Sequence, residues 1–452
     1  MTIHTYAQAR SYLESFIRPS VFERIAEDSH MQDPLDRMRV LLSLLDNPQK
    51  KFKSVQVSGT SGKGSTSYLL GNILINAGYK TGLATSPHLD RINQRMLIND
   101  REIPNTILLD LVNRLSLAVE QIKQLPEGAP SYFELLTALA FLYFAQEKVE
   151  IAVIEVGLEG QYDATNVLDP LIVILTNISK DHVELLGDTE EAIATEAMSI
   201  VRKGTSISPL VITGITQNNI LDELKKRTRG LGLTLGVLNQ TIKISRVSTS
   251  EKGVGFCYMD SFGSLGKLYV SLRGEYQALN AALAVAASRG LEHKGFVISG
   301  HSIRKGLAEA FFAGRFEVLQ KNGKTIILDS AHNEAKITAF LHALDQYYPD
   351  ESKVFIVGFK KNKDSSPMTK QLFLRNGSFI FTQFHKGADY ARSVSMTIAE
   401  LRENAEIADN VQFSRTVTIA LRKAMGLKAN IIIVTGSLYL VGEVRSILMP
   451  RG

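Results

Sequence analysis

The stretch SVQVSGTSGKGSTS, Ser54–Ser67, decides how this chain folds. Its β-rich start leads into a glycine-rich turn, and the apolar residues behind the turn are spaced as on one face of a helix over 66–77. A strand, a glycine-rich turn and a helix in this order direct backbone N–H groups and a helix N-terminus at a phosphate. Lys63 adds a positive charge for the outer phosphates of a nucleotide, and the hydroxyl of Ser65 can reach Mg²⁺.

The turn departs from the standard P-loop pattern in its spacing. That pattern requires glycine at position 57 and serine or threonine at position 64, where this chain has Val57 and Gly64. A surface turn rich in glycine and serine is therefore the alternative to a phosphate-binding loop. The residues of the predicted loop are Gly59, Thr60, Ser61, Gly62, Lys63, Gly64 and Ser65.

Length and composition bound the class of protein. A chain of 452 residues predicts two or three domains, each large enough for its own core. Hydrophobic residues make up 44% and charged residues 21%, which is typical of a soluble globular protein. The net charge of +5 suits a phosphate-binding enzyme as well as a nucleic-acid binder. The sequence has no block of Lys and Arg and no RNA-binding aromatic pattern, so no nucleic-acid partner is predicted.

Cysteine usage and hydropathy indicate the compartment. Cys257 is the only cysteine, which excludes an internal disulfide and a cysteine-based metal site and suits a reducing environment. The first residues are too polar for a signal peptide, and the longest apolar stretch, Ile431–Val444, is interrupted and too short to span a bilayer. We therefore expect a cytoplasmic protein with no membrane partner.

Strand patterns alternate with helical patterns along the first part of the chain. The apolar runs at 81–85, 151–157 and 171–177 read as buried strands, and this alternation predicts a parallel sheet with helical crossovers. Ligands of such sheets bind at the carboxyl ends of the strands. The side chains expected to converge at that edge are Lys63, Ser86, Glu155 and His182.

A second series of strand-then-helix units begins after Phe311–Gly314, which we take as the domain boundary. The predicted domains are 1–312, the ATP-binding domain, and 313–452. Between 235 and 272 the strands are shorter and separated by Gly/Ser turns, which indicates an antiparallel edge or flap. The predicted fold class is α/β, with an N-terminal P-loop-type parallel-sheet ATPase domain and a smaller C-terminal Rossmann-like domain.

Glu155 and His182 are the candidate metal ligands. Glu155 ends an otherwise apolar strand, where a buried carboxylate is costly unless it is paired or bound to a metal. Near a triphosphate its natural partner is Mg²⁺, and a structural salt bridge is the alternative. His182 could complete the magnesium site or contact phosphate, but a lone histidine is more often structural and Mg²⁺ prefers oxygen ligands.

Three polar residues of the second domain are candidates for a facing nucleotide site. Asp329 and His332 lie at a strand end, and Arg315 lies just upstream. Together they could bind phosphate and ribose, whereas each alone reads as an ordinary surface polar group. No Ser/His/Asp or Cys/His nucleophile set is visible, so a covalent hydrolase is not predicted.

With these residues in view, the chain resembles the folylpolyglutamate synthase/dihydrofolate synthase family, within the Mur ligase superfamily. The likeness runs from residue 35 to residue 445, nearly the whole chain. The segments that carry it are, in chain order, Gly59–Ser65, Thr85–Leu89, Phe133–Glu134, Glu155–Leu158, Asp163–Val167, Asp181–His182, Leu186–Gly187, Gly314–Glu317 and Ala331–Asn333.

The resemblance implies an ATP-dependent amide ligase that acts as a monomer with ATP and Mg²⁺. A carboxylate of a folate- or pteroate-type compound is phosphorylated by ATP, and the amine of L-glutamate then attacks the acyl phosphate. The implied catalytic residues are Lys63, Glu155, His182 and His332, with a first Mg²⁺ on Ser65 and Glu155 and a second on His182. The implied ATP contacts from the second side are Asn280, Arg315 and Asp329, and the residues toward the pterin or acyl substrate are Ser86, His88 and Phe133.

The chain departs from the family pattern at the helix after His182. Ala197 stands where the family carries a lysine that is carbamoylated to become a metal ligand, and alanine supplies neither the carbamate nor the charge. Glu196 is next in sequence but about 100° away around a helix, so it cannot simply take that place. Further departures lie at Gln94, Glu159, Gln161, Tyr276 and Asn362.

Three hypotheses therefore remain. The first is a ligase that adds glutamate to a folate-type carboxylate, which the nucleotide loop and Glu155 favour. The second is a Mur-type ligase with another acyl substrate. The third is a catalytically weakened nucleotide-binding paralogue that acts through partners, which Ala197 favours.

Overall fold

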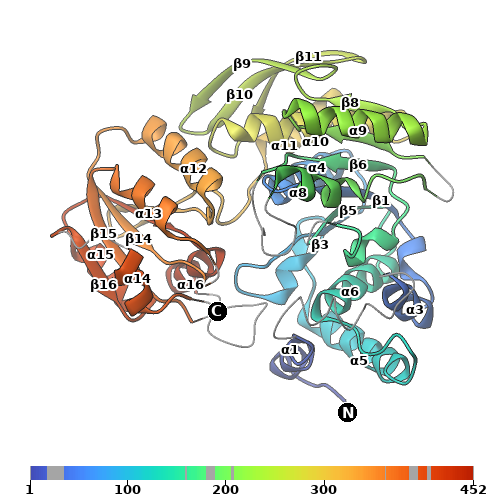
Figure 1. The fold of residues 1–452 in the computed structure, drawn as a ribbon, viewed down its shortest axis with the longest axis horizontal. Coiled ribbons are helices and arrows are strands. Elements are labelled where there is room, and N and C mark those ends of the chain that lie inside the picture. Colours follow the sequence, from blue (N-terminus) through green and yellow to red (C-terminus); the bar gives the residue numbers. More distant parts are fainter. Residues whose placement is uncertain are drawn as a thin grey trace.

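Two lobes, each built on its own β-sheet, make up the structure (Figure 1). It is a computed structural model that describes residues 2–17, 35–157, 160–179, 189–204, 208–361, 363–385, 395–404 and 409–450. The larger lobe carries the elements up to α11, and the smaller lobe, orange to red in Figure 1, carries those from β12 onward. The predicted α/β fold, a mainly parallel sheet followed by a second and smaller α/β unit, is confirmed.

The sheet of the larger lobe has eight strands in the order β4-β3-β2-β5-β1-β6-β7-β8. Six of them run parallel, whereas β3 and β4 form an antiparallel edge beside β2. The carboxyl ends of the parallel strands therefore meet at one edge, where a ligand can bind. The strands are β1 Lys53–Ser58, β2 Thr81–Ala84, β3 Met96–Ile98, β4 Arg101–Glu102, β5 Ile151–Glu155, β6 Ile172–Leu175, β7 Leu210–Thr213 and β8 Leu235–Val237.

Alternate residues of β5 face two apolar cores, so this central strand is buried on both sides. Ile151 and Val153 pack with α4, α10 and α11, whereas Ala152 and Ile154 pack with α1, α3, α5 and α6. A further cluster joins α8 and α9 to β6 and β7. The helices are α1 Tyr6–Glu14, α3 Asp36–Leu44, α4 Lys63–Asn76, α5 Asn105–Ile122, α6 Tyr132–Gln146, α8 Glu190–Met198, α9 Asn218–Leu231, α10 Tyr276–Glu292 and α11 Gly300–Ala308.

A three-stranded antiparallel sheet lies beside α10 and α11, at the top of Figure 1. Its strands are β9 (Lys243–Ser250), β10 (Gly253–Asp260) and β11 (Gly263–Val270). Buried side chains of β10 and β11, such as Phe256, join the core around α4. The antiparallel segment predicted for 235–272 is thus present, except that β8 at its start belongs to the main sheet.

The smaller lobe has a six-stranded sheet in the order β12-β13-β17-β14-β15-β16, in which only β12 is antiparallel. Phe355 and Ile356, neighbours on β14, belong to two different apolar clusters, so this sheet is also covered on both faces. Its elements are β12 Glu317–Lys321, β13 Lys324–Leu328, α12 Glu334–Tyr347, β14 Lys353–Val357, α13 Ser366–Phe373, β15 Gly377–Thr382, α14 Ile398–Asn404, β16 Val411–Ser414, α15 Val417–Gly426, β17 Ile431–Thr435 and α16 Leu438–Leu448.

The loop after β2, which belongs to the larger lobe, packs against the smaller lobe. Leu89 packs against the smaller lobe between two glycines: a Cβ on Gly314 would lie 3.2 Å from its Cδ2, and a Cβ on Gly442 would lie 2.1 Å from its carbonyl oxygen. Asp90 accepts a hydrogen bond from the hydroxyl of Ser446 at 3.4 Å. The absence of side chains at these two glycines therefore allows the loop and α16 to approach closely.

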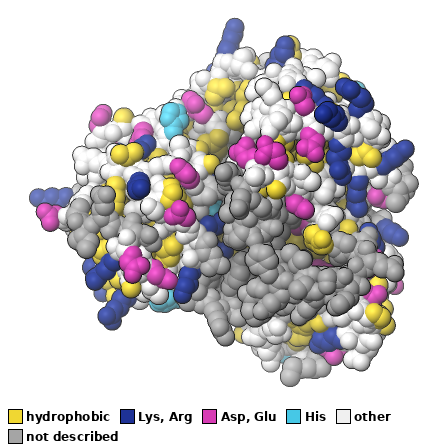
Figure 2. Space-filling model, in the orientation of Figure 1, with side chains coloured by type: hydrophobic (Ala, Val, Ile, Leu, Met, Phe, Trp, Pro, Cys, Tyr) yellow, Lys and Arg dark blue, Asp and Glu magenta, His cyan; other side chains and the backbone are white. Residues whose placement is uncertain are grey.

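The surface in Figure 2 mixes basic, acidic and apolar side chains over both lobes, in keeping with the modest net charge of +5. In the parts of the chain that the structure describes, no helix is long and apolar enough to cross a membrane.

Candidate active site

The glycine turn is the first part of the site, and it leads directly into α4. Gly62 is the N-cap of the helix with φ of 86°, and a Cβ there would lie 2.3 Å from Oδ1 of Asn280. Because the chain enters the helix at this residue, α4 begins at Lys63 and not at the predicted residue 66. The first N–H groups of the helix therefore lie next to the turn, and Nζ of Lys63 donates to the carbonyl of Gly59 at 2.5 Å.

The end of β6 fixes the shape of this turn. The amide of Thr60 donates to the carbonyl of Asn177 at 2.9 Å, and the amide of Ser61 donates to its side-chain oxygen at 2.8 Å. The hydroxyl of Thr176 donates to the carbonyl of Ser61 at 2.7 Å. Gly59 has φ of 119°, and a Cβ there would lie 2.3 Å from the Thr176 hydroxyl, so glycine is required at this contact.

Two hydroxyls beside the turn suit a phosphate. Oγ of Ser61 and Oγ of Ser179 are buried and have no hydrogen-bond partner among the described residues. A buried hydroxyl without a partner costs free energy, on the order of 1–3 kcal/mol, unless a ligand or water satisfies it. Donors of this kind, together with the N–H groups of a helix start, fit an anionic ligand.

Glu155 is the last residue of β5 and lies between the turn and the loop after β2. Its Oε2 accepts a hydrogen bond from the amide of Ser86 at 2.9 Å, and its Oε1 would lie 3.5 Å from a Cβ on Gly64. Burial raises the pKa of Glu155 above its usual value, and the charge of Lys63 and the Ser86 amide oppose that shift. A buried carboxylate whose second oxygen faces a phosphate-type turn is a suitable cation ligand.

These residues fit a magnesium ion in part. Ser65 lies in the first turn of α4 and is buried, and Glu155 supplies a carboxylate oxygen nearby in the fold. Among the described residues there is no cluster of three His, Cys, Asp or Glu side chains that would enclose a metal alone. The Ser65 hydroxyl and the Glu155 carboxylate nevertheless suit Mg²⁺, because this ion commonly takes one or two carboxylates and completes its shell with phosphates and water. His182 lies outside the described residues.

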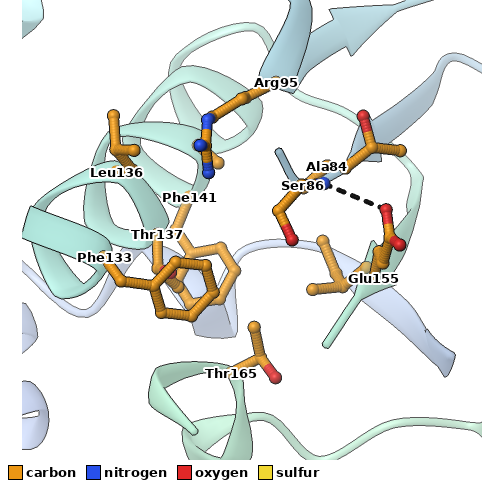
Figure 3. A pocket seen from close by; sticks show the side chains of 12 residues that line it. Ala84, Ser86, Arg95, Phe133, Leu136, Thr137, Phe141, Glu155 and Thr165 are labelled. Carbon is orange, nitrogen blue, oxygen red and sulfur yellow. Dashed lines mark hydrogen bonds between the residues drawn. The ribbon is translucent and has the colours of Figure 1, made fainter. Parts of the chain in front are cut away.

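A small cavity of about 30 Å³ opens beside Glu155 (Figure 3). Aromatic rings from α6 form one side of it, and Ser86 and Glu155 face them across the cavity. Phe133 packs against the chain after β5, since a Cβ on Gly157 would lie 2.2 Å from its ring. Its lining residues are Ala84, Thr85, Ser86, Arg95, Phe133, Leu136, Thr137, Ala140, Phe141, Ile154, Glu155 and Thr165.

Arg95, which the sequence did not reveal as a site residue, brings a positive charge to this cavity. Its Nε donates to Nδ1 of His88 at 2.8 Å, and its guanidinium lies 6.0 Å from the ring centre of Tyr132. Both Arg95 and His88 are buried, at 5% and 6% exposure. His88, which is predicted to lie near the acyl substrate, therefore contacts Arg95, one of the residues that line the cavity. Arg95 ends the short 3₁₀ helix Ile92–Arg95, and only the fold brings it to the cavity.

The smaller lobe contributes a second buried carboxylate. Asp329 follows β13 and accepts hydrogen bonds from the amides of Phe316 and Ala331, each at 2.8 Å. Burial raises the pKa of Asp329 to about 6, against the opposing charge of Arg315. Arg315 also lowers the pKa of Glu155. The guanidinium thus influences carboxylates of both lobes, which brings the two sets of predicted residues together.

Asn280 and His332 are the other two residues that the sequence predicts to face the nucleotide. Asn280 on α10 lies against Gly62 and donates to the side chain of Gln277 at 2.9 Å. His332 follows Asp329, with Nδ1 at 2.7 Å from the carbonyl of Ser330 and Nε2 at 3.2 Å from Nζ of Lys336.

The helix that carries Ala197 is α8. Ala197 is fully buried in an apolar cluster with Val156 and Met198, so the surroundings of its methyl group are hydrophobic. Glu196 points elsewhere: its Oε2 accepts from the amide of Gln161 at 3.3 Å and would lie 2.3 Å from a Cβ on Gly160. The carboxylate of Glu196 therefore supports the chain that follows β5.

Comparisons with known proteins agree with this geometry. The Mur ligase middle domain model matches residues 57–288, and the dihydrofolate synthetase C-terminal domain model matches residues 314–448. The dihydrofolate synthase/folylpolyglutamate synthase of Bacillus subtilis (strain 168) is 30% identical over 444 residues, which cover 97% of this chain and 98% of that protein.

Solved structures have the same fold over nearly the whole chain. A Mycobacterium tuberculosis folylpolyglutamate synthase complexed with ADP superposes with a TM-score of 0.86 at 26% identity, covering 98% of this chain and 99% of that one. A complex of FPGS with AMPPCP and folate gives a TM-score of 0.81 at 28% identity, covering 99% and 100%. From its fold, its glycine turn and these relatives, the chain belongs to the folylpolyglutamate synthase/dihydrofolate synthase family.

Proposed function

We propose that this chain is an ATP-dependent ligase that joins L-glutamate to the carboxylate of a folate-type compound, a tetrahydrofolate or dihydropteroate derivative. The observation that carries the proposal is the position of Glu155, with one oxygen fixed by Ser86 and the other facing the glycine turn at Gly64. That carboxylate lies between a phosphate-type loop and a cavity lined by aromatic rings. The relatives solved with AMPPCP, ADP and folate support the same assignment of ligands.

The reaction requires two displacements. A carboxylate oxygen of the folate-type substrate attacks the γ-phosphorus of ATP, and ADP leaves. The amine of glutamate then attacks the acyl carbon, loses a proton, and expels phosphate that carries the former carboxylate oxygen. The activated acyl group must be kept from water between the two steps, which a site closed between two lobes achieves.

The residues have separate roles in this scheme. The amides of the glycine turn and Nζ of Lys63 hold the phosphates and oppose the charge that develops on the transferred group. Ser65 and Glu155 would hold Mg²⁺, which when bound neutralises phosphate charge. Asn280, Arg315 and Asp329 contact the nucleotide from the other side, with His332 near the phosphates. His182 completes the metal site in the proposal, although it lies outside the described residues.

The cavity beside Glu155 supports an aromatic acyl substrate. Phe133 and Phe141 present rings, and Arg95 presents a cation near the end where Ser86 lies. Its volume of about 30 Å³ holds only one or two water molecules, so a pterin ring requires the cavity to widen when substrate binds. We further propose that the protein acts as a monomer in the cytoplasm.

A coupled assay of ADP release tests this function. We expect ADP release only when ATP, L-glutamate and either dihydropteroate or tetrahydrofolate are all present. Lys63→Ala and Glu155→Gln should each lower the rate at least a hundredfold. The first removes the cation that opposes the phosphate charge, and the second removes the carboxylate charge that would hold Mg²⁺. Lys80→Ala, which removes a half-buried ion pair with Glu147, is the matched control and should leave the rate within about twofold.

Two outcomes would contradict the proposal. Tight binding of ATP without ligation of any folate-type acceptor would favour the weakened paralogue, which the apolar surroundings of Ala197 keep as the second candidate. ADP release with glutamate and a non-folate carboxylate, but not with folates, would favour a ligase of another acyl substrate.

A further inference from the structure

Phe312 lies in the segment that joins the two lobes and contacts both of them. Its ring stacks on Tyr68 of α4, with the ring centres 5.0 Å apart and the planes 16° from parallel. The guanidinium carbon of Arg315 lies 5.1 Å from the centre of the same ring. A single side chain thus connects α4, which begins at the nucleotide loop, to the arginine of the other lobe.

The same ring reaches the nucleotide loop itself. A Cβ on Gly64 would lie 3.1 Å from Cε1 and 3.2 Å from Cζ of Phe312, and 3.5 Å from the carboxylate of Glu155. The two distances to the ring are tighter than ordinary contact, so a side chain at position 64 would press on the ring. The glycine that replaces the usual P-loop hydroxyl is therefore the residue that allows Phe312 to lie against the loop.

Tyr68 is itself held in place. Its hydroxyl donates a hydrogen bond to a carboxylate oxygen of Asp100, and its ring is buried in the core around α4. The stack therefore rests on a fixed surface of the larger lobe. Because Arg315 influences both Glu155 and Asp329 electrostatically, a change in the ring beneath it would move a charge that acts at the centre of the site.

We propose that Phe312 is a positioning residue that holds the guanidinium of Arg315 over the nucleotide loop, so that the smaller lobe adds its positive charge to the phosphates of ATP. The inference deepens the proposed function and rests on it. Phe312 need not touch the substrate, since it acts through Arg315 and through its contact at Gly64.

A double-mutant cycle tests this role. Phe312→Leu, Arg315→Ala and the double variant are compared with the unchanged protein for kcat, KM for ATP and affinity for AMPPCP. Phe312→Leu should lower kcat about tenfold and the affinity for AMPPCP about fivefold, of the order expected for a lost cation–π contact and a displaced charge. In the Arg315→Ala background the same change should alter either quantity less than twofold.

Two further variants separate positioning from packing. Phe296→Leu makes the same substitution in an aromatic pair with Tyr79 against the same core, away from the site, and should leave kcat and affinity within twofold. Phe312→Trp keeps an aromatic face and should retain at least half of the kcat of the unchanged protein. Melting temperatures show whether each variant is folded.

Equal effects of Phe312→Leu in both backgrounds, or an effect no larger than that of Phe296→Leu, would overturn the inference. Failure of the unchanged protein to ligate glutamate would overturn the proposed function instead. In that case the AMPPCP affinities of the four proteins still test Phe312, because they require no catalysis.

Discussion

Two buried carboxylates of opposite lobes, Glu155 at the end of β5 and Asp329 directly after β13, share the charge of Arg315. Each accepts backbone hydrogen bonds, Glu155 from Ser86 and Asp329 from Phe316 and Ala331. Burial raises the pKa of both side chains, because a charge is poorly solvated there. Each therefore gains from a cation in the site, which is the physical reason to expect MgATP between the lobes.

Asp329 makes the stability of the protein depend on pH. Its pKa is about 6 in the folded state against 3.8 unfolded, so the folded protein retains a proton that the unfolded chain has lost. Stability should therefore fall as the pH rises from about 4 to 6, by up to about 3 kcal/mol. Denaturant unfolding across this range measures the effect, and in Asp329→Asn the loss of stability with rising pH should be smaller, because only the contribution of other groups such as Glu155 is left. A slope that is the same in both proteins would contradict this origin.

Substitution of Ala197 by lysine tests whether the metal site has been rebuilt around the alanine. The side chain is fully buried in an apolar cluster, so a lysine there would place an ammonium without polar surroundings. We expect Ala197→Lys to lower the melting temperature and to leave ligation no faster, with or without bicarbonate. Thr195→Lys, on an exposed position of the same helix, should leave both unchanged. Faster ligation by Ala197→Lys in bicarbonate would instead mean that the native metal site is incomplete.

At the scale of elements, the segment from Ser86 to Arg95 contacts Glu155, the cavity and the smaller lobe. It fixes Glu155 through the amide of Ser86, lines the cavity with Arg95, and packs Leu89 on the smaller lobe. We therefore expect a displacement of the smaller lobe at Leu89 to move the backbone that holds Glu155. The loop thus couples contact between the lobes to the geometry of the site.

Gly442 is the point at which that coupling can be altered. A Cβ there would lie 2.1 Å from the carbonyl oxygen of Leu89, and a backbone atom cannot turn away as a side chain can. Gly442→Ala should therefore destabilise the protein by roughly 1–3 kcal/mol and lower the ligation rate. Thermal unfolding and the ADP assay measure both effects.

Gly426→Ala is the matched control for that substitution. Gly426 ends a helix, and nothing lies within 4 Å of a Cβ placed there. The stability of the Gly426→Ala protein should stay the same or rise slightly, since alanine is favoured over glycine in helices by up to about 1 kcal/mol. Equal losses in the two variants would mean that the contact with Leu89 does not matter.

The elements that the sequence predicted well are those with a strong pattern. The strands at Glu155 and before Asn177 are continuous apolar runs buried on both faces, and such runs are recognisable without a structure. The strands Glu317–Lys321 and Val411–Ser414 were not predicted, because each lies at an edge of its sheet with only one buried residue. Edge strands are paired on one side and lack a full apolar pattern.

The site could be predicted only where its residues belong to a local motif. The glycine turn with Lys63 follows β1 and Glu155 ends β5, so their convergence follows from the parallel sheet. Arg95 ends a short 3₁₀ helix and Phe312 lies in the interdomain segment, and their roles depend on contacts with distant residues. No spacing within the sequence reveals such contacts.

At the scale of the whole molecule, the proposed nucleotide site takes residues from both lobes. The larger lobe supplies the phosphate loop and Glu155, and the smaller lobe supplies Arg315 and Asp329. The proposed division at residue 312 stays a prediction, and it falls between the two matched family models, which end at 288 and begin at 314. Phe312 at this division connects the halves through its contacts with Tyr68 and Arg315.

The fate of a carboxylate oxygen tests the central claim, ligation through an acyl phosphate, most directly. A folate-type substrate labelled with ¹⁸O in its free carboxylate is incubated with ATP, L-glutamate and the protein, and the products are analysed by mass spectrometry. We expect a glutamylated product and one ¹⁸O atom in each phosphate released, because the carboxylate oxygen leaves with phosphorus. Phosphate without label, or ATP cleavage without a glutamylated product, would contradict the account.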